Sequence, residues 1–360
     1  MDRRQFLRST AAALTAAAFS NVTLGQQLAE PTVASLPRWR GFNLLEWFDG
    51  NHRRPFREED FELIASLGFD FVRLPLSYRC WNSGKVEEWD RIDEDALKQV
   101  DQAVEFGRKH GVHVNINFHR APGYCVNPPK EPLVLWDDAR ALDACANHWA
   151  HFAKRYKGRP NREVTFDLLN EPADIPEEKY VKVVKRLVGA IHEADPDRLI
   201  IADGLRWGTK PVPALAGLVA QSTRGYDPSR LSHYKANWME GSDTWPEPTW
   251  PLTYRREDHE EVWNRERLRK DRIEPWTALA AKGSGVHVGE WGCYNKTPHA
   301  VALAWMADFL ALWKEAGWGW AMWNFRGDFG PLDSRRADVR YEDWKGHKLD
   351  RKMLELIQAH

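Results

Sequence analysis

The 360-residue sequence contains only four cysteines, Cys80, Cys125, Cys145 and Cys293, which are widely separated and form no Cys-x-x-Cys motif. Structural zinc sites use closely spaced Cys and His ligands, so this scarcity argues against a metal site. One disulfide is compatible with an exported protein, but a domain of this size does not require it. We therefore expect buried thiols, and the sequence does not decide whether any two of them pair.

An excess of charge of either sign is also absent. The 51 basic residues balance 52 acidic ones, which gives a formal net charge of -1. Nucleic acids and anionic membrane surfaces attract proteins through a positive field, which this chain does not generate. We therefore expect a neutral ligand and neither nucleic acid nor a membrane as partner. The 43% hydrophobic residues suffice for the core of one large domain or two smaller ones.

The beginning of the chain predicts a targeting segment. Arg3 and Arg4 precede an apolar, Ala-rich stretch that ends near Phe19, and this order resembles a twin-arginine export signal. The stretch is too short and its side chains are too small for a membrane-spanning helix. We expect residues 1–30 to be an export signal with an unstructured lead-in, and the mature protein to be periplasmic or extracellular without a membrane span. The alternative is a basic start to an ordinary helix.

Strand-like and helix-like segments alternate from Trp39 to the C-terminus. The predicted strands are residues 40–47, 69–76, 112–119, 163–169, 199–203, 231–236, 286–289 and 319–324. The predicted helices are residues 58–67, 93–110, 137–156, 177–193, 212–220, 276–281, 299–315 and 349–358.

Strict alternation of this kind predicts an α/β fold with parallel strands, a (β/α)8 TIM barrel formed by residues 31–360 as a single catalytic domain. A doubly wound open sheet is the alternative. The barrel is favoured because no glycine-rich phosphate loop follows the first strand and no second half is visible. Barrel active sites lie at the C-terminal ends of the strands, so these ends are where functional residues are expected.

Polar and aromatic residues cluster at those ends. The set consists of Glu46, Trp47, Arg73, His119, Asn170, Glu171, Asp203, His233, Tyr234, Glu290, Trp291, Trp323 and Asn324. Any one of them has a structural explanation, such as a satisfied histidine or an arginine that neutralises a neighbouring carboxylate. So many polar groups at one rim of a barrel favour a functional site instead.

Glu171 and Glu290 are the two carboxylates of this set that suggest a reaction. A pair of carboxyl groups across a barrel mouth is suited to hydrolysing a glycosidic bond, with one protonated and the other ionised. A separation of roughly 5 to 5.5 Å predicts retention of configuration, and roughly 6.5 to 9.5 Å predicts inversion. The sequence does not give this distance.

From about Trp39 to its C-terminus, the chain resembles glycoside hydrolase family 5, a family of cellulases and mannanases built on a (β/α)8 barrel. The resemblance rests on Arg73 in Val-Arg-Leu-Pro, His119, Asn170-Glu171-Pro172, His233, Glu290 in Gly-Glu-Trp-Gly and Trp323 in Met-Trp-Asn.

This resemblance implies a retaining mechanism, with Glu171 as acid/base, Glu290 as nucleophile and no metal or organic cofactor. It also implies that Asn170 binds the sugar 2-hydroxyl, and that Arg73 and His119 hold the nucleophile and the sugar. Trp323 would be the stacking platform, followed by a cis peptide bond.

One position departs from the family pattern. The family shows His-x-Tyr at the sixth strand, with the Tyr donating a hydrogen bond to the nucleophile, whereas this sequence reads His233-Tyr234-Lys235. Adjacent residues of a strand point to opposite faces, so His233 and Tyr234 face the mouth together only if the strand bends. We treat both as candidate substrate-binding residues, together with Glu46 at the end of the first strand.

A long connection, residues 237–274, carries four tryptophans. Long structured loops are often functional, so we expect Trp245 and Trp250 to be further stacking platforms. The alternative is that these rings only pack the loop onto the barrel.

The sequence therefore predicts a monomeric, retaining endo-β-glycanase that hydrolyses β-1,4-glucan chains. A β-mannanase or a β-1,3-glucanase is the alternative on the same scaffold, because specificity lies in variable loops. A carbohydrate-binding barrel without catalysis is the alternative of a different class. The sequence does not decide between endo and exo action.

Overall fold

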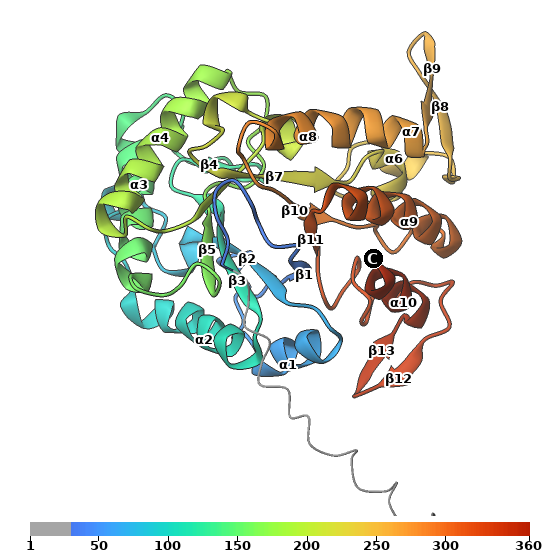
Figure 1. Ribbon diagram of the computed structural model, residues 1–360, viewed down its shortest axis with the longest axis horizontal. Helices are drawn as coiled ribbons and strands as arrows, with labels where there is room; N and C mark the ends of the chain where they lie inside the picture. The colour runs from blue at the N-terminus through green and yellow to red at the C-terminus, as the bar shows by residue number, and fades with distance from the viewer. Residues whose placement is uncertain (1–29) are drawn as a thin grey trace, which may run out of the picture.

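The computed structural model describes residues 30–360, so the predicted export signal lies outside the described residues but for Glu30. Eight parallel strands close into a barrel, in the order β1, β2, β3, β5, β6, β7, β10, β11 and back to β1 (Figure 1). Their bounds are Arg40–Asn43, Phe71–Ser77, His113–Ala121, Val164–Asp167, Ile200–Asp203, Ala220–Gly225, Val286–Trp291 and Gly319–Met322. The predicted (β/α)8 barrel is confirmed.

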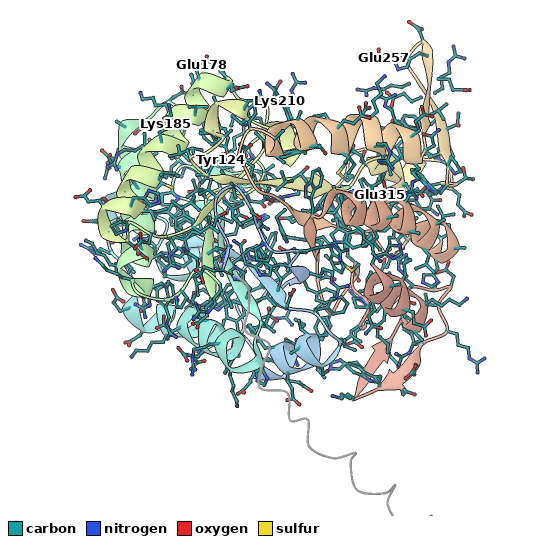
Figure 2. All side chains as sticks on the ribbon, viewed as in Figure 1. Tyr124, Glu178, Lys185, Lys210, Glu257 and Glu315 are labelled. Atoms are coloured by element: carbon teal, nitrogen blue, oxygen red, sulfur yellow. The ribbon has the colours of Figure 1, made fainter. Side chains whose placement is uncertain are left out.

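The longer helices surround this barrel, with charged side chains such as Glu178, Lys185 and Glu315 on the outside (Figures 1 and 2). They are α1 (Glu58–Ser66), α2 (Glu94–His110), α3 (Ala139–Tyr156), α4 (Glu177–Ala194), α8 (Glu274–Ala280), α9 (His299–Ala316) and α10 (Arg351–Ala359). None of the helices within residues 30–360 has the length and apolar character needed to cross a membrane.

Short strands and helices lie in the loops that connect the barrel elements. Strand β4 (Tyr124–Cys125) pairs antiparallel with β3, and the hairpin β8 (Leu252–Arg256) and β9 (His259–Trp263) projects from the body (Figure 1). A second hairpin, β12 (Glu342–Trp344) and β13 (His347–Leu349), precedes α10. The short helices α5 (Leu205–Gly208) and α6 (Ser229–Ser232) follow β6 and β7, and α7 (Arg265–Leu268) follows β9.

Helix ends follow capping chemistry that is visible in the sequence. The side chain of Asp93 accepts a hydrogen bond from the backbone N–H of Ala96 and begins α2. Gly111 adopts the left-handed conformation that ends this helix. Asp138 caps α3 in the same way as Asp93 caps α2. The predicted helices 93–110 and 137–156 are confirmed to within a residue or two.

The predicted sixth strand, residues 231–236, is wrong. Leu231 and Ser232 belong to a four-residue helix, α6, and residues 233–236 follow it. The sixth barrel strand is β7, Ala220–Gly225. The helix predicted over residues 212–220 is also absent from the described chain, since only a short 3-10 turn, Pro213–Leu215, lies there. The sequence did not predict β7 because this strand is polar. Its side chains are buried and make hydrogen bonds, such as that from Thr223 Oγ1 to the Gly208 carbonyl.

Candidate active site

Six ionisable side chains meet where the strands end at the mouth of the barrel. They are Arg73 on β2, Asp167 at the end of β5, Glu171, Asp203 at the end of β6, Arg224 on β7 and Glu290 on β10. All except Glu171 are buried, and the four carboxyl groups face two guanidinium groups. Such an excess of buried acid favours retention of a proton.

Arg73 holds Glu290. Its Nη1 atom donates to Glu290 Oε1 over 2.6 Å, and its Nε atom donates to Asp167 Oδ2 over 2.7 Å. Its Nη2 atom donates to Asn170 Oδ1 over 2.9 Å. These contacts agree with the role that the family resemblance implies for Arg73, and they fix the Glu290 carboxylate at one side of the mouth.

Arg224 makes the corresponding contacts to Glu171. Its Nε atom donates to Glu171 Oε1 over 3.0 Å, and its Nη1 atom donates to Asp203 Oδ1 over 2.9 Å. Its Nη2 atom lies 3.5 Å from Glu290 Oε1. One guanidinium group therefore contacts both members of the carboxylate pair.

Glu171 lies beyond the end of β5, in a segment held by side chains. Its backbone has a φ of 50°, an uncommon conformation for a residue with a side chain. Its N–H donates to Asp203 Oδ2 over 2.8 Å, and its carbonyl accepts from the Tyr124 hydroxyl over 2.7 Å. Burial, with a further contribution from Glu290, raises the pKa of the Glu171 carboxyl to about 8, while Arg224 opposes this rise.

Tyr226 follows β7 and contacts the opposite carboxylate. Its hydroxyl group donates to Glu290 Oε2 over 3.2 Å. Burial and the Glu290 charge raise the pKa of Tyr226 well above its usual value, so the phenol stays protonated as a donor. Arg224-Gly225-Tyr226 at the end of β7 therefore stands where the family pattern has His-x-Tyr, and the Tyr is not displaced.

Three predicted substrate-binding residues surround the carboxylate pair. Asn170 Nδ2 and His119 Nδ1 are buried and have no hydrogen-bond partner within residues 30–360. Burial lowers the pKa of His119 to about 3, so its ring is neutral. The ring of Trp323 lies 5.9 Å from that of His119 and 5.6 Å from that of Phe48. Unpaired polar atoms beside an aromatic ring suit a sugar, which offers hydroxyl groups and an apolar face.

The peptide bond after Trp323 is not cis, contrary to what the resemblance implied. Within residues 30–360, cis bonds precede only Pro129, Pro228 and Pro251.

The remaining candidates lie at different distances from the pair. His233 packs beside Tyr226, with ring centroids 5.0 Å apart, whereas Tyr234 is buried under Lys235 and makes no contact with the carboxylates. Glu46 lines a hollow of about 500 Å³ beside Asn324 at the rim. These placements do not test their roles, which stay predictions.

The two loop tryptophans contact protein groups. The Nε1 atom of Trp250 donates to Asp308 Oδ2 on α9 over 2.8 Å, and the Arg230 guanidinium lies over the ring of Trp245. The contact of Trp250 favours the packing alternative for this residue.

Sequence reasoning missed Arg224 and Tyr226. A detectable signal was present, because Arg-Gly-Tyr keeps the spacing of the family's His-x-Tyr. The polar character of β7 concealed it.

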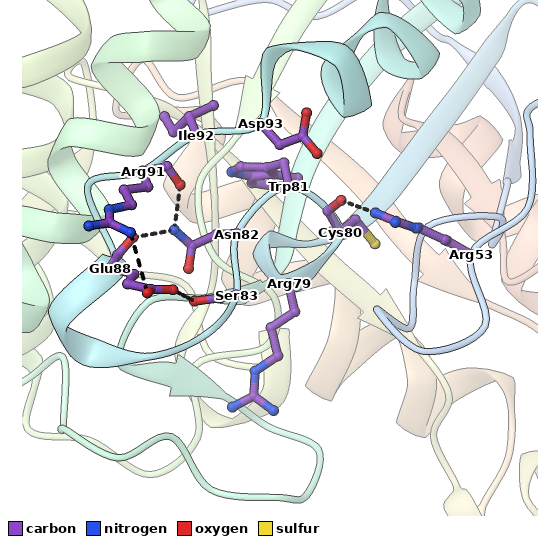
Figure 3. A pocket seen from close by; sticks show the side chains of 10 residues that line it. All are labelled: Arg53, Arg79, Cys80, Trp81, Asn82, Ser83, Glu88, Arg91, Ile92 and Asp93. Atoms are coloured by element: carbon purple, nitrogen blue, oxygen red, sulfur yellow. Dashed lines mark hydrogen bonds and ion pairs between the residues drawn. The ribbon is translucent and has the colours of Figure 1, made fainter.

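Another hollow lies after β2 and contains neither member of the carboxylate pair. Its volume is about 420 Å³, and Figure 3 shows Arg53, Asn82, Glu88 and Arg91 among its lining residues. Several of its polar groups bind one another: Arg53 donates to the Cys80 carbonyl, and Asn82 donates to the carbonyl of Arg91. It offers no comparable set of reactive groups.

The described residues contain no cluster of three or more His, Cys, Asp or Glu side chains that could hold a metal ion. All four cysteines are free thiols, and Cys80, Cys145 and Cys293 are buried.

Comparison with known proteins identifies the family. Residues 29–328 match the cellulase family, glycosyl hydrolase family 5. Endoglucanase C of Acetivibrio thermocellus is 26% identical over 331 residues, which cover 84% of this chain and 95% of the relative. A solved structure described as a glycoside hydrolase is 38% identical with a TM-score of 0.84, and the match covers 89% of this chain and 99% of the other.

Cel5A of Thermotoga maritima, solved with cellobiose, shares the fold at 22% identity with a TM-score of 0.71, and the match covers 89% of this chain and 96% of Cel5A. The family match spans most of the chain and includes both carboxylates. This protein therefore belongs to glycosyl hydrolase family 5 and is a glycoside hydrolase.

Proposed function

We propose that this protein is a retaining endo-β-glycanase that hydrolyses β-1,4-glucan chains by double displacement. The observation that supports the reaction is the carboxylate pair at the barrel mouth, where Glu171 and Glu290 contact the same Arg224 guanidinium. A shared guanidinium agrees with the short carboxylate spacing typical of retaining enzymes. The similarity to an endoglucanase over 95% of that relative's length supports the substrate class.

In the first step, a Glu290 oxygen attacks the anomeric carbon while Glu171 gives its proton to the leaving glycosidic oxygen. The bond between carbon and leaving oxygen breaks, and a covalent glycosyl ester on Glu290 forms. In the second step, Glu171 takes a proton from water, and the water oxygen displaces Glu290. The raised pKa of Glu171 supplies the proton at neutral pH, and Arg73 holds Glu290 in place for attack.

The unpaired atoms beside the pair define how the sugar is held. Asn170 Nδ2 donates to the 2-hydroxyl, His119 Nδ1 accepts from a hydroxyl group, and Trp323 stacks on the ring of the same sugar. The two hydrogen bonds satisfy buried atoms that otherwise lack a partner within residues 30–360, so sugar binding is favourable.

Export through a twin-arginine-type signal to the periplasm or the cell exterior is part of this proposal. It rests on Arg3 and Arg4 before the Ala-rich stretch and on a polymeric substrate, which is met outside the cytoplasm. Fractionation of cells that express the full chain, with sequencing of the new N-terminus, tests it. A product that keeps residues 1–30 in the cytoplasm contradicts it.

The enzymatic test compares the wild type with Glu171→Gln and Glu290→Gln on defined polysaccharides. We expect cleavage of β-1,4-glucan, and a loss of about 10³-fold or more in each variant on oligosaccharides. Glu171→Gln should form the glycosyl-enzyme at near wild-type rate from 2,4-dinitrophenyl cellobioside, because this leaving group needs no proton. NMR should show the β-anomer as the first product.

Each contrary result has a distinct meaning. An initial α-anomer contradicts retention, and a preference for β-mannan or β-1,3-glucan contradicts the proposed specificity. A wild type that binds glucan and cleaves nothing on the panel is a carbohydrate-binding barrel.

A further inference from the structure

We propose that Arg224, paired with Asp203, is a positioning residue that fixes which oxygen of Glu171 carries the transferable proton and that stabilises Glu171 once this proton has left. The inference rests on the proposed role of Glu171 as acid/base. It concerns the position where the family pattern has His, a residue that is neutral at the pH at which Glu171 titrates, whereas Arg keeps its charge.

The geometry restricts the proton to one oxygen. Arg224 Nε donates to Glu171 Oε1 over 3.0 Å, and a guanidinium group cannot accept a hydrogen bond. Oε1 must therefore act as an acceptor, and a proton on the carboxyl resides on Oε2. This oxygen has no hydrogen-bond partner within residues 30–360, and the side chain is 17% exposed, so Oε2 is available to the leaving group.

Asp203 holds both halves of this arrangement. Its two oxygens accept from Nη1 and Nη2 of Arg224, and Oδ2 also accepts from the backbone N–H of Glu171. The bidentate ion pair fixes the plane of the guanidinium group. The same carboxylate therefore orients Arg224 and the peptide that carries Glu171.

The fold leaves specific room for this arginine. A side chain at Gly289 would place its Cβ atom 2.9 Å from Arg224 Nη1 and 2.4 Å from Ser222 Oγ. A Cβ atom at Gly208, whose φ is +74°, would lie 2.7 Å from Arg224 Cγ. Two glycines thus give the long side chain its path to Glu171, and β10 bulges between Val288 and Glu290 as it passes.

The charge of Arg224 opposes the other influences on Glu171. The groups that face Glu171 from the surrounding elements are Tyr124 on β4, Asp203 on β6, Arg224 on β7, Tyr226 after β7 and Glu290 on β10. Burial and the acidic neighbours favour the protonated carboxyl, and Arg224 favours the carboxylate. Proton donation leaves a carboxylate on Glu171 beside this fixed cation, so Arg224 makes donation easier and keeps Glu171 ionised, as the second step requires at its start.

The test compares Arg224→Lys, which keeps the charge, with Arg224→His, which is neutral above pH 7 and restores the residue of the family pattern. The measurement is kcat/KM against pH on phenyl and 2,4-dinitrophenyl cellobiosides, with thermal unfolding as a check of folding. For Arg224→His, we expect the alkaline limb of the pH profile of kcat/KM to move about one pH unit upward. We also expect kcat/KM for the phenyl substrate to fall roughly 10-fold to 100-fold. For the dinitrophenyl substrate, kcat/KM should fall less than about 3-fold, since its leaving group needs no acid. Arg224→Lys should keep the wild-type limb.

Two results in Arg224→His would overturn the proposal and leave Arg224 a purely structural role. One is an equal loss of kcat/KM on both substrates, and the other is an unchanged alkaline limb of the pH profile. If Arg224→His fails to fold, Arg224→Lys decides. A shifted alkaline limb of its pH profile overturns the proposal, and an unshifted limb with kcat/KM preserved on the dinitrophenyl substrate supports it. The proposed function fails separately, in a wild type that cleaves neither cellobioside or in a Glu171→Gln variant that keeps full activity on the phenyl substrate.

Discussion

The hydroxyl group of Tyr226 donates to Glu290 Oε2 over 3.2 Å, while Arg73 holds the other oxygen of the same carboxylate. The tyrosine thereby holds the second oxygen of the carboxylate that we propose as the nucleophile. Because the bond is made to an ionised group in a buried site, its loss should affect the rate more than substrate binding.

We therefore expect Tyr226→Phe to lower kcat by roughly 10-fold to 100-fold with little change in KM, because the change removes one hydrogen bond at the reacting carboxylate. Steady-state kinetics on a cellobioside provide the measurement. Tyr234→Phe is the matched control, since Tyr234 is buried away from the pair. A larger loss in Tyr234→Phe than in Tyr226→Phe would show that the sequence-based assignment of Tyr234 was correct.

Site residues that lie in apolar strands or recognisable motifs could be predicted from the sequence, and those on or next to a polar strand could not. Glu171, Glu290 and Arg73 end apolar or recognisable motifs, and the structure brings all three together. Arg224 and Tyr226 lie on and after β7, whose buried Gln, Ser and Thr side chains bind backbone and side-chain groups instead of packing in an apolar layer. Hydrophobic periodicity does not detect such a strand.

Among the elements, the turn after β6 has a strained backbone next to the segment that carries Glu171, the proposed acid/base. Arg206 and Trp207 both have positive φ angles, 52° and 57°, in a region that bulky residues avoid. The Trp207 N–H donates to the Pro172 carbonyl over 2.9 Å, and the Arg206 N–H donates to the Ala173 carbonyl. These hydrogen bonds maintain the strained backbone and hold Trp207, which is 49% exposed, beside the segment that carries Glu171.

We expect Trp207→Ala to raise KM for cellohexaose about 10-fold and to leave thermal stability unchanged, because an exposed ring beside the proposed acid contributes stacking rather than packing. Aryl cellobiosides, which place no sugar there, should show no change. The measurement is KM as a function of oligosaccharide length. An equal increase in KM for every substrate would contradict a role in binding the leaving group.

Trp250→Ala is the comparison. Trp250 bonds to Asp308 on α9 and packs against the core, so its removal should cost about 2 to 4 kcal/mol of stability and leave the length dependence unchanged. Unchanged stability with weaker oligosaccharide binding would restore the stacking role expected from the sequence.

Strand ends were harder to predict than strands. Strand β5 ends at Asp167, and the apolar Leu168 and Leu169 lie beyond it, buried in the core. An apolar run therefore extended the predicted strand to residue 169. The tertiary contacts of Tyr124 and Asp203 with Glu171, which the sequence does not show, determine the path of the chain there.

For the whole molecule, the order of apolar and periodic segments sufficed to predict the barrel, because parallel strands with crossover helices admit few architectures. The protonation of the interior depends on contacts that are invisible at that level. His113, His148 and His287 are buried, and burial lowers their pKa values to about 3, 4 and 3. All three rings are therefore neutral near pH 7.

His148 shows why protonation is unfavourable. Its Nδ1 atom accepts from Trp81 Nε1 over 3.0 Å, while its Nε2 atom donates to the Trp89 carbonyl. A proton on Nδ1 would face the N–H of Trp81, so the charged ring loses a hydrogen bond as well as its hydration.

The folded pKa of His148 lies below the unfolded value, so its stabilising contribution is complete above about pH 6.5 and is lost as the pH falls through about 4. Between these limits, the unfolded chain binds more protons than the folded one, and the free energy of unfolding falls by up to about 1.4 kcal/mol for each pH unit of acidification through this one group.

The substitution His148→Gln offers an acceptor and a donor that do not titrate. We expect its free energy of unfolding to depend less on pH, by about 2 kcal/mol between pH 7 and pH 5, in urea titrations followed by tryptophan fluorescence. A slope in His148→Gln equal to that of the wild type would mean that the ring titrates normally and that burial does not hold it neutral.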